Sequence, residues 1–124
     1  MSIERLDHIN IRTANLAALI TFYEQIIGLK QGSRPAFEST GAWMYLGERD
    51  IVHLNESPTA QLSREPQLEH FALRAADLQA FTDNLNSRGI SYRSNTISEA
   101  NLRQIHLHDP DGNHVEINFS IAHS

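Results

Sequence analysis

The chain has 124 residues, with ten lysines and arginines against fifteen aspartates and glutamates, which gives a net charge of −5. This length is enough for one ordinary domain with its own core, and the dispersed, net acidic charge gives no indication of a nucleic-acid or anionic membrane partner. There is no cysteine, which excludes disulfides, thiolate metal ligands and a cysteine nucleophile.

The N-terminal segment lacks the features of a targeting sequence. MSIERLDHINI has no basic start and no apolar core. No apolar run in the chain approaches the roughly 20 residues that span a bilayer. We therefore expect a soluble, cytoplasmic protein.

The first half of the chain predicts one strand, one helix and three further strands. Residues 3–12 alternate as a strand, with isoleucines on one parity and His8 on the other. A helix is expected to begin at Asn15, a good N-cap residue, and to end at Gly28. Short strands are expected to follow over residues 29–34, 42–47 and 50–55.

A polar stretch over residues 57–66 contains two prolines and predicts a linker. It would join a first module, residues 1–56, to a second module, residues 67–124, within a single domain. The second module opens with the strand LEHFALRA, and a helix capped by Asp77 follows and ends at Gly89. Its last strands are expected over residues 90–96, 103–108 and 113–120, with the sequence DPDGN forming a tight turn between the final two.

The two modules are copies of one pattern. An offset of 62 residues places His8 on His70 and Arg12 on Arg74, and near the end of each copy the register slips by one residue, so that His53 falls on Glu116. The repeat is therefore structural and not merely compositional.

Each copy predicts a βαβββ module of the α+β class. A short sheet covered by one helix leaves its other face in need of a partner. Two paired copies would make a curved eight-stranded mixed sheet, with the helices on the outer face and a concave cleft inside.

Four repeat-equivalent side chains are candidate metal ligands: His8, His53, His70 and Glu116. Strand parity turns all four away from the helix-packed face, and Asn10, a candidate substrate-binding residue, shares that parity. One such histidine alone is more often a hydrogen-bonded packing residue. Burying Glu116 without a cation or a donor, however, would cost several kcal/mol. Three imidazoles and a carboxylate suit a divalent metal, and zinc, nickel, cobalt, manganese and iron all stay open.

Several segments carry a resemblance to a known family: LDHINI, YEQIIGL, LEHFAL and above all HDPDGNHVEI. They resemble the vicinal oxygen chelate superfamily, which includes glyoxalase I, fosfomycin-resistance thiol transferases, extradiol dioxygenases and bleomycin-resistance proteins. The resemblance covers essentially the whole chain. It implies a metal held by His8, His70 and Glu116, with His53 as a fourth ligand in some branches. It also implies a homodimer whose cleft combines the first module of one chain with the second of its partner.

The function that the resemblance implies is that of a metal-dependent, glyoxalase-like lyase or isomerase. Such an enzyme acts on a small, vicinally oxygenated substrate through a metal-stabilised enolate or oxyanion. Glu116 is the only carboxylate among the four ligands and is the candidate base, with His53 as a second catalytic candidate. Bacterial glyoxalase I typically has glutamate at the position of His53, so this chain departs from a two-carboxylate proton shuttle.

Other members of the superfamily supply alternatives. A fosfomycin-resistance-type thiol transferase would need a basic cluster for the phosphonate, and the second half of the chain has no lysine. A ring-cleaving extradiol dioxygenase would need open positions on ferrous iron, one of which His53 would occupy. A bleomycin-resistance-like protein would bind a small molecule without a catalytic metal, and such proteins generally lack the ligand set.

Further side chains are candidates for substrate binding. Arg12 matches a position that contacts the glutathione carboxylate in the glyoxalase family, and in that role it would favour a thiol conjugate as the substrate. Alternatively, Arg12 is an ordinary solvated residue. Trp43 and Tyr45 either line the cleft or pack in the core. His106 and His108 share one parity and either reach the cleft or face solvent.

Overall fold

The computed structural model describes residues 2, 4–60 and 66–121. The chain forms two compact units, Met1–Leu62 and Ser63–Ser124, and their boundary falls within the stretch 57–66 that the sequence marks as a linker. That the two units act as a single domain stays a prediction.

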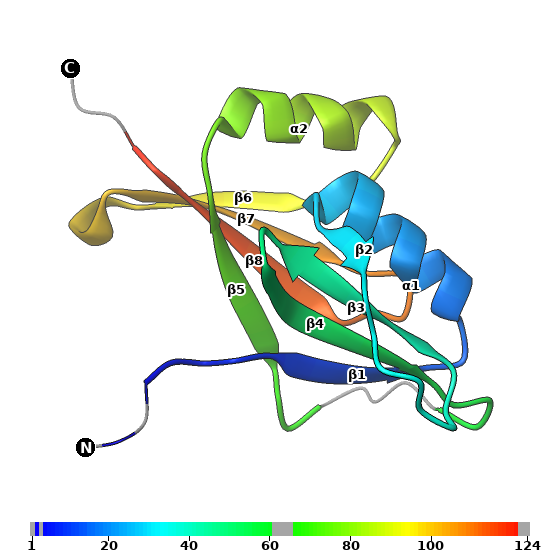
Figure 1. The fold of residues 1–124 in the computed structure, drawn as a ribbon. Coiled ribbons are helices and arrows are strands. Elements are labelled where there is room, and N and C mark those ends of the chain that lie inside the picture. The colour runs from blue at the N-terminus through cyan, green and yellow to red at the C-terminus, as the bar shows by residue number, and fades with distance from the viewer. Residues whose placement is uncertain (1, 3, 61–65, 122–124) are drawn as a thin grey trace. The chain divides into compact units, whose positions relative to one another are not determined.

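Each unit has the element order strand, helix and three strands (Figure 1). The first unit consists of β1 (Ile9–Thr13), α1 (Leu16–Phe22) with a π-helical continuation (Tyr23–Ile27), β2 (Lys30–Gly32), β3 (Gly41–Leu46) and β4 (Arg49–Glu56). The second consists of β5 (His70–Ala75), α2 (Leu78–Ser87), β6 (Arg93–Ile97), a 3₁₀ turn (Ser98–Ala100), β7 (Leu102–His108) and β8 (His114–Ser120). The predicted α+β class with paired βαβββ modules is confirmed. Within the described ranges, no helix is long and apolar enough to cross a membrane.

The eight expected strands are divided equally between two mixed sheets with the same internal order. The first sheet runs β1-β4-β3-β2 and the second runs β5-β8-β7-β6. β1 pairs with β4, and β5 with β8, in parallel, whereas the other neighbours are antiparallel. A parallel pair requires a long crossover, which the helix and two strands of each unit supply. β4 and β8 therefore have hydrogen-bonded strands on both sides.

The first strand is shorter than its sequence pattern predicts. β1 begins at Ile9, which pairs with Val52 on β4, and the described residues before it form no strand. Residues 1 and 3 of the predicted strand lie outside the described residues. His8 therefore lies just before the strand and not within it.

The first helix begins where the sequence predicts but is not capped as predicted. The Asn15 side chain makes no capping hydrogen bond. Instead, the buried Thr13 hydroxyl accepts a hydrogen bond from the Asn15 backbone N–H at 2.8 Å. The helical segment ends as expected at Gly28, whose φ of +92° lies in the left-handed region that favours glycine.

The second helix follows its predicted signals at both ends. Asp77 Oδ1 accepts a hydrogen bond from the Ala80 backbone N–H at 3.1 Å, which satisfies one of the free donors of the first turn. Gly89, with φ of +66°, follows the helix. Leu85 is fully buried, and Phe81 packs against Phe119 of β8 with ring centroids 5.6 Å apart. These contacts hold α2 on one face of its sheet.

The turn between β7 and β8 is held by one aspartate. Asp109 is 4% exposed, and its Oδ1 accepts hydrogen bonds from the backbone N–H groups of Asp111 and Asn113 at 3.0 and 2.8 Å. Its Oδ2 accepts another from the Asn113 side chain at 2.8 Å. The tight turn is confirmed, and it fixes the register in which β7 and β8 pair.

Strand alternation separates the two faces of the second sheet. Ile105, Leu107, Val115, Ile117 and Phe119 are at most 3% exposed. The intervening residues on β7 and β8 are polar, among them His106 and Glu116. Because successive side chains of a strand point to opposite faces, one face packs on the helix and the other carries the polar groups.

We predict that Leu85→Ala lowers the free energy of unfolding by about 2–5 kcal/mol, because a fully buried leucine is replaced by a cavity. Urea denaturation would measure the loss. Leu46→Ala is the matched control, since Leu46 is 57% exposed and its truncation should change the free energy by no more than about 0.5 kcal/mol. Equal losses in both variants would contradict the packing described for α2.

Candidate metal and substrate site

The polar face of the second sheet brings Arg93, His106 and Glu116 into one row across three strands. Arg93 on β6 pairs with His106 on β7, which in turn pairs with Glu116 on β8. In the adjacent row, His114 on β8 lies between His108 on β7 and His70 on β5. The two rows thus place candidates that the sequence predicted beside two residues that it did not, Arg93 and His114. The predicted candidates in these rows are His70, His106, His108 and Glu116.

Glu116 is the buried carboxylate of this face, with 8% of its surface exposed. Its Oε2 accepts hydrogen bonds from Asn118 Nδ2 at 2.8 Å and Gln104 Nε2 at 3.2 Å. Its Oε1 lies 3.5 Å from His70 Nε2 and 3.9 Å from His106 Nδ1. The amides thus hold one oxygen, while the other faces two imidazoles.

His70 is oriented by its sequence neighbour. Its Nδ1–H donates to the Glu69 carboxylate, which directs Nε2 toward Glu116. The hydrogen bond to Glu69 raises the pKa of His70, and the same bond lowers the pKa of Glu69. A carboxylate on the far nitrogen of a histidine is the usual partner of a metal-ligating imidazole.

A chain of hydrogen bonds continues from Glu116 through Gln104 to two histidines. Because Gln104 Nε2 donates to Glu116, its Oε1 is left to accept from His106 Nε2–H at 3.2 Å. Burial and, after it, the charge of Arg93 lower the pKa of His106, and both favour the neutral form of this ring. His106 Nδ1 then accepts from His114 Nε2–H at 2.9 Å, and His114 Nδ1 lies 3.4 Å from Glu69 Oε1.

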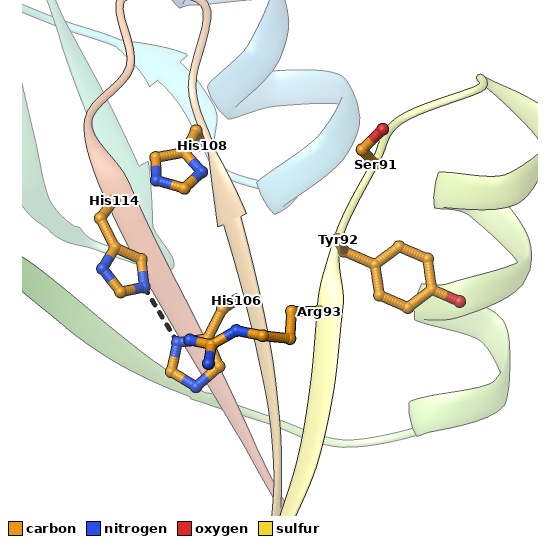
Figure 2. A pocket seen from close by; sticks show the side chains of 6 residues that line it. All are labelled: Ser91, Tyr92, Arg93, His106, His108 and His114. Atoms are coloured by element: carbon orange, nitrogen blue, oxygen red, sulfur yellow. Dashed lines mark hydrogen bonds between the residues drawn. The ribbon is translucent and has the colours of Figure 1, made fainter.

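A pocket of about 420 Å³ opens on this face, and Figure 2 shows the side chains around it. It is lined by Ser91, Tyr92, Arg93, His106, His108 and His114. Arg93 extends toward His106, whereas the Tyr92 ring points in the opposite direction. His108 stacks on His114 with ring centroids 5.2 Å apart. His106 and His108 are therefore pocket residues.

A compact group of potential metal ligands lies at one end of the same face. Glu69, His70 and His114 each place one ligand atom within 4.8 Å of the others. Glu69 and His114 are additions to the predicted set. The sequence contained a signal for both, since His114 shares strand parity with Glu116, and Glu69 stands at the repeat position of Asp7.

The first-module candidates form an aromatic stack. His53, only 7% exposed, lies between His8 and Trp43, with ring centroids 3.8 and 4.1 Å away and planes within 12° and 11° of parallel. His53 Nε2–H donates to Asp50 Oδ2 at 2.6 Å, and this hydrogen bond lowers the pKa of Asp50. The structure thus brings His8 and His53 into direct contact.

The acid that precedes each histidine is repeated along with it. His8 Nδ1–H donates to Asp7 Oδ2 at 2.7 Å, as His70 Nδ1–H donates to Glu69. The repeat therefore preserves an acid–histidine dipeptide with the same hydrogen-bonded nitrogen. The four-ligand site made of both histidines with His53 and Glu116 stays a prediction, because the two pairs belong to different units.

The remaining substrate candidates of the first module occupy different environments. Asn10 accepts a hydrogen bond from Asn55 at 2.8 Å, and Arg12 lies on β1 with an exposed side chain. The Tyr45 hydroxyl donates to the Ser33 carbonyl at 2.6 Å, so it ties β3 to the segment after β2. Trp43 contacts His53 directly, and Asn10 is the partner of His53 in the register of β1 and β4.

Comparison with known proteins identifies the family. A model of the Glyoxalase/Bleomycin resistance protein/Dioxygenase superfamily matches residues 5–117. The chain therefore belongs to this superfamily, and the resemblance predicted from the sequence is confirmed.

The relatives within this superfamily are distant. YwbC, an uncharacterized protein of Bacillus subtilis strain 168, is 27% identical over 121 residues, which are 91% of this chain and 95% of YwbC. Glyoxylase I 4 of Arabidopsis thaliana is 24% identical over 120 residues, which are 90% of this chain and 68% of the plant protein. A solved glyoxylase/bleomycin resistance protein/dioxygenase domain from Frankia sp. EAN1pec has a TM-score of 0.80 at 17% identity, with 96% of this chain and 99% of that domain covered. This last likeness shows the fold alone.

We predict that His53→Ala moves the fluorescence emission of Trp43 to longer wavelength, because removal of the stacked imidazole exposes the indole to water. Trp43 is the only tryptophan, so the emission spectrum reports on this stack alone. His108→Ala, which removes a histidine from the second unit, should leave the spectrum unchanged. An identical shift in both variants, or none in either, would contradict the stack.

Proposed function

We propose that this protein is a metal-dependent lyase or isomerase of the glyoxalase type. Its substrate is a small molecule with oxygens on adjacent carbons, a class that includes thiol conjugates. The observation that carries the proposal is the pair formed by the buried Glu116 Oε1 and His70 Nε2, 3.5 Å apart. Membership of the superfamily and the distant relative named Glyoxylase I 4 support the class of reaction.

The donor set of the second unit fits a divalent metal. Two ligands about 2.1 Å from a tetrahedral ion lie roughly 3.4 Å apart, close to the separation of Glu116 Oε1 and His70 Nε2. Glu69 already holds the far nitrogen of His70, as a metal-ligating imidazole requires. We propose His8 and His53 as the other ligands. A bound metal would polarise the substrate oxygens and stabilise the negative charge that develops on them.

We assign to Glu116 Oε1 the role of the general base, which accepts the proton of the substrate. Asn118 and Gln104 hold Oε2 in place, so the carboxylate cannot rotate without breaking both hydrogen bonds. A base fixed in this way acts at one defined position, which general base catalysis requires. His53, with its Nε2–H held by Asp50, is proposed as the second catalytic group.

An unsatisfied acceptor beside Glu116 supports an oxygenated substrate. Asn118 Oδ1 is buried and has no hydrogen-bond partner among the described residues, and the other end of the same amide donates to Glu116. A buried acceptor left without a donor costs free energy. The hydroxyl group of a vicinally oxygenated substrate, or a water molecule, would supply the missing donor.

The proposal includes a homodimer in the cytoplasm. The alternative functions within the superfamily differ in the metal that they would bind. A dioxygenase would take ferrous iron, and a binding protein of the bleomycin-resistance kind would take no catalytic metal. Metal analysis of the purified protein, with its mass in solution, separates these cases.

We predict that His70→Ala removes stoichiometric metal binding and leaves the chain folded. His70 lies at the edge of its sheet, with 39% of its side chain exposed, so its removal should not disturb the core. Elemental analysis after metal loading would measure the loss, and circular dichroism would report the fold. His108→Ala is the matched control and should keep about one metal per chain. Full metal occupancy in His70→Ala would reject the ligand assignment.

We predict that Glu116→Gln costs much more activity than metal affinity. The amide cannot accept the proton, and loss of a general base lowers kcat by about 100-fold or more, whereas the three proposed histidine ligands remain to hold the metal. Assays on thiohemiacetals, catechols and epoxides would establish the turnover, and titration of the apoprotein would give the metal affinity. Equal losses in the two quantities would show that Glu116 is a ligand only.

A further inference from the structure

We infer that the pocket formed by β6, β7 and β8 binds an oxyanion, the carboxylate or phosphate group of the substrate. This inference rests on the proposed function in one respect, since it names the substrate class of the same site as a small acid that carries vicinal oxygens. The binding of the anion itself depends on the pocket alone.

The side chains that line the pocket are all basic or neutral. Arg93, His106, His108 and His114 come from three adjacent strands and face the same volume of about 420 Å³ (Figure 2). Ser91 and Tyr92 complete the lining, and no carboxylate belongs to it. A cavity of this size accepts a small molecule rather than a peptide or a nucleic acid.

Arg93 supplies a charge that the protein does not neutralise. Its guanidinium makes no ion pair with any carboxylate in the described part of the chain. It reaches across toward His106, its partner in the strand register, and its charge contributes to the lowered pKa of that ring. An arginine fork of this kind matches the geometry of a carboxylate or a phosphate.

The two carboxylates that border the pocket are engaged elsewhere. Glu116 accepts hydrogen bonds from Asn118 and Gln104, and Glu69 accepts one from His70. Each also lies near a histidine of the pocket, Glu69 Oε1 at 3.4 Å from His114 Nδ1 and Glu116 Oε1 at 3.9 Å from His106 Nδ1, but neither forms an ion pair with Arg93. An anion that enters the pocket meets the free guanidinium of Arg93 and the exposed ring of His108.

The position of the pocket connects the anion to the proposed chemistry. His106 lines the pocket and also lies 3.9 Å from Glu116 Oε1. An acid group bound by Arg93 would therefore place the adjacent carbons of a small substrate beside His106 and close to Glu116, the proposed base. Arg93 is a binding residue in this scheme, which orients the substrate and takes no part in proton transfer.

The test uses inorganic phosphate and acetate as probes of the chelator-treated, full-length protein at constant ionic strength. Removing any metal first ensures that the anions cannot bind to it. NMR signals of the histidine ring C–H groups and calorimetric titration would report binding. We expect one or both anions to shift the signals of His108 and His114, and the tighter of the two identifies the group that the pocket takes.

The decisive variant is Arg93→Gln, with Arg103→Gln as its matched control. Arg103 lies on the face of β7 opposite to His106 and donates to Thr96 and Ser94 at 2.9 and 3.4 Å. Arg103→Gln therefore removes the same charge from the same sheet but not from the pocket. We expect Arg93→Gln to raise the Kd by about tenfold or more, because a charge-assisted hydrogen bond is lost. Arg103→Gln should change the Kd less than about twofold, and Arg93→Lys, which keeps the charge but loses the fork, should be intermediate.

The outcomes separate this inference from the proposed function. Equal Kd values in Arg93→Gln and Arg103→Gln, or no binding of either anion by the unaltered protein, would overturn the anion site. Metal content would be measured on the same samples, and we expect Arg93→Gln to retain it. Arg93-dependent phosphate binding by a protein that takes up no metal would support the pocket and reject the metal-dependent lyase.

Discussion

A buried carboxylate in the middle of a sheet is the constraint around which the second unit is organised. Glu116 has strands on both sides and 8% exposure, so its charge must be compensated by the protein or by a ligand. Asn118 and Gln104 hold one oxygen through hydrogen bonds. The other oxygen lies 3.5 Å from His70 Nε2 and 3.9 Å from His106 Nδ1, so the histidines supply the compensation on that side. This second oxygen is the one proposed as the ligand atom.

The two copies of the repeat have the same backbone arrangement but carry chemically different side chains at equivalent positions. In the first unit the position of Glu116 is taken by His53, and the position of His106 by Trp43. The result there is a stack of three rings, in which His53 donates a hydrogen bond to Asp50. In the second unit the same register produces a chain of hydrogen bonds from Glu116 through Gln104 and His106 to His114, whose Nδ1 lies 3.4 Å from Glu69 Oε1. The second unit therefore holds the only carboxylate among the four proposed ligands, and with it the proposed base.

The sequence predicted what depends on local pattern and missed what depends on neighbouring strands. The order of elements, the faces of β4 and β8 and the cap at Asp77 follow from alternation and capping chemistry within a few residues. The late start of β1 could not be predicted from the alternation over residues 3–12, and β4 does not explain it, since β4 extends past the partner of Ile9 to Arg49. Nor could the Arg93 pocket be predicted, because the absence of lysine in the second half hid a basic group that forms only when β6, β7 and β8 pair.

Hydrogen bonds at the three histidines also determine which nitrogen each one can offer to a metal. His8 and His70 have Nδ1 bound to the preceding acid, which leaves Nε2 for coordination. His53 has Nε2 bound to Asp50 and so would use Nδ1. Since a carboxylate partner fixes the orientation of a metal-ligating imidazole, each predicted histidine ligand already has the partner that such a role requires. A histidine that packs in the core also needs a hydrogen-bond partner. The feature that these three share with metal-ligating histidines is that the partner is a carboxylate in every case.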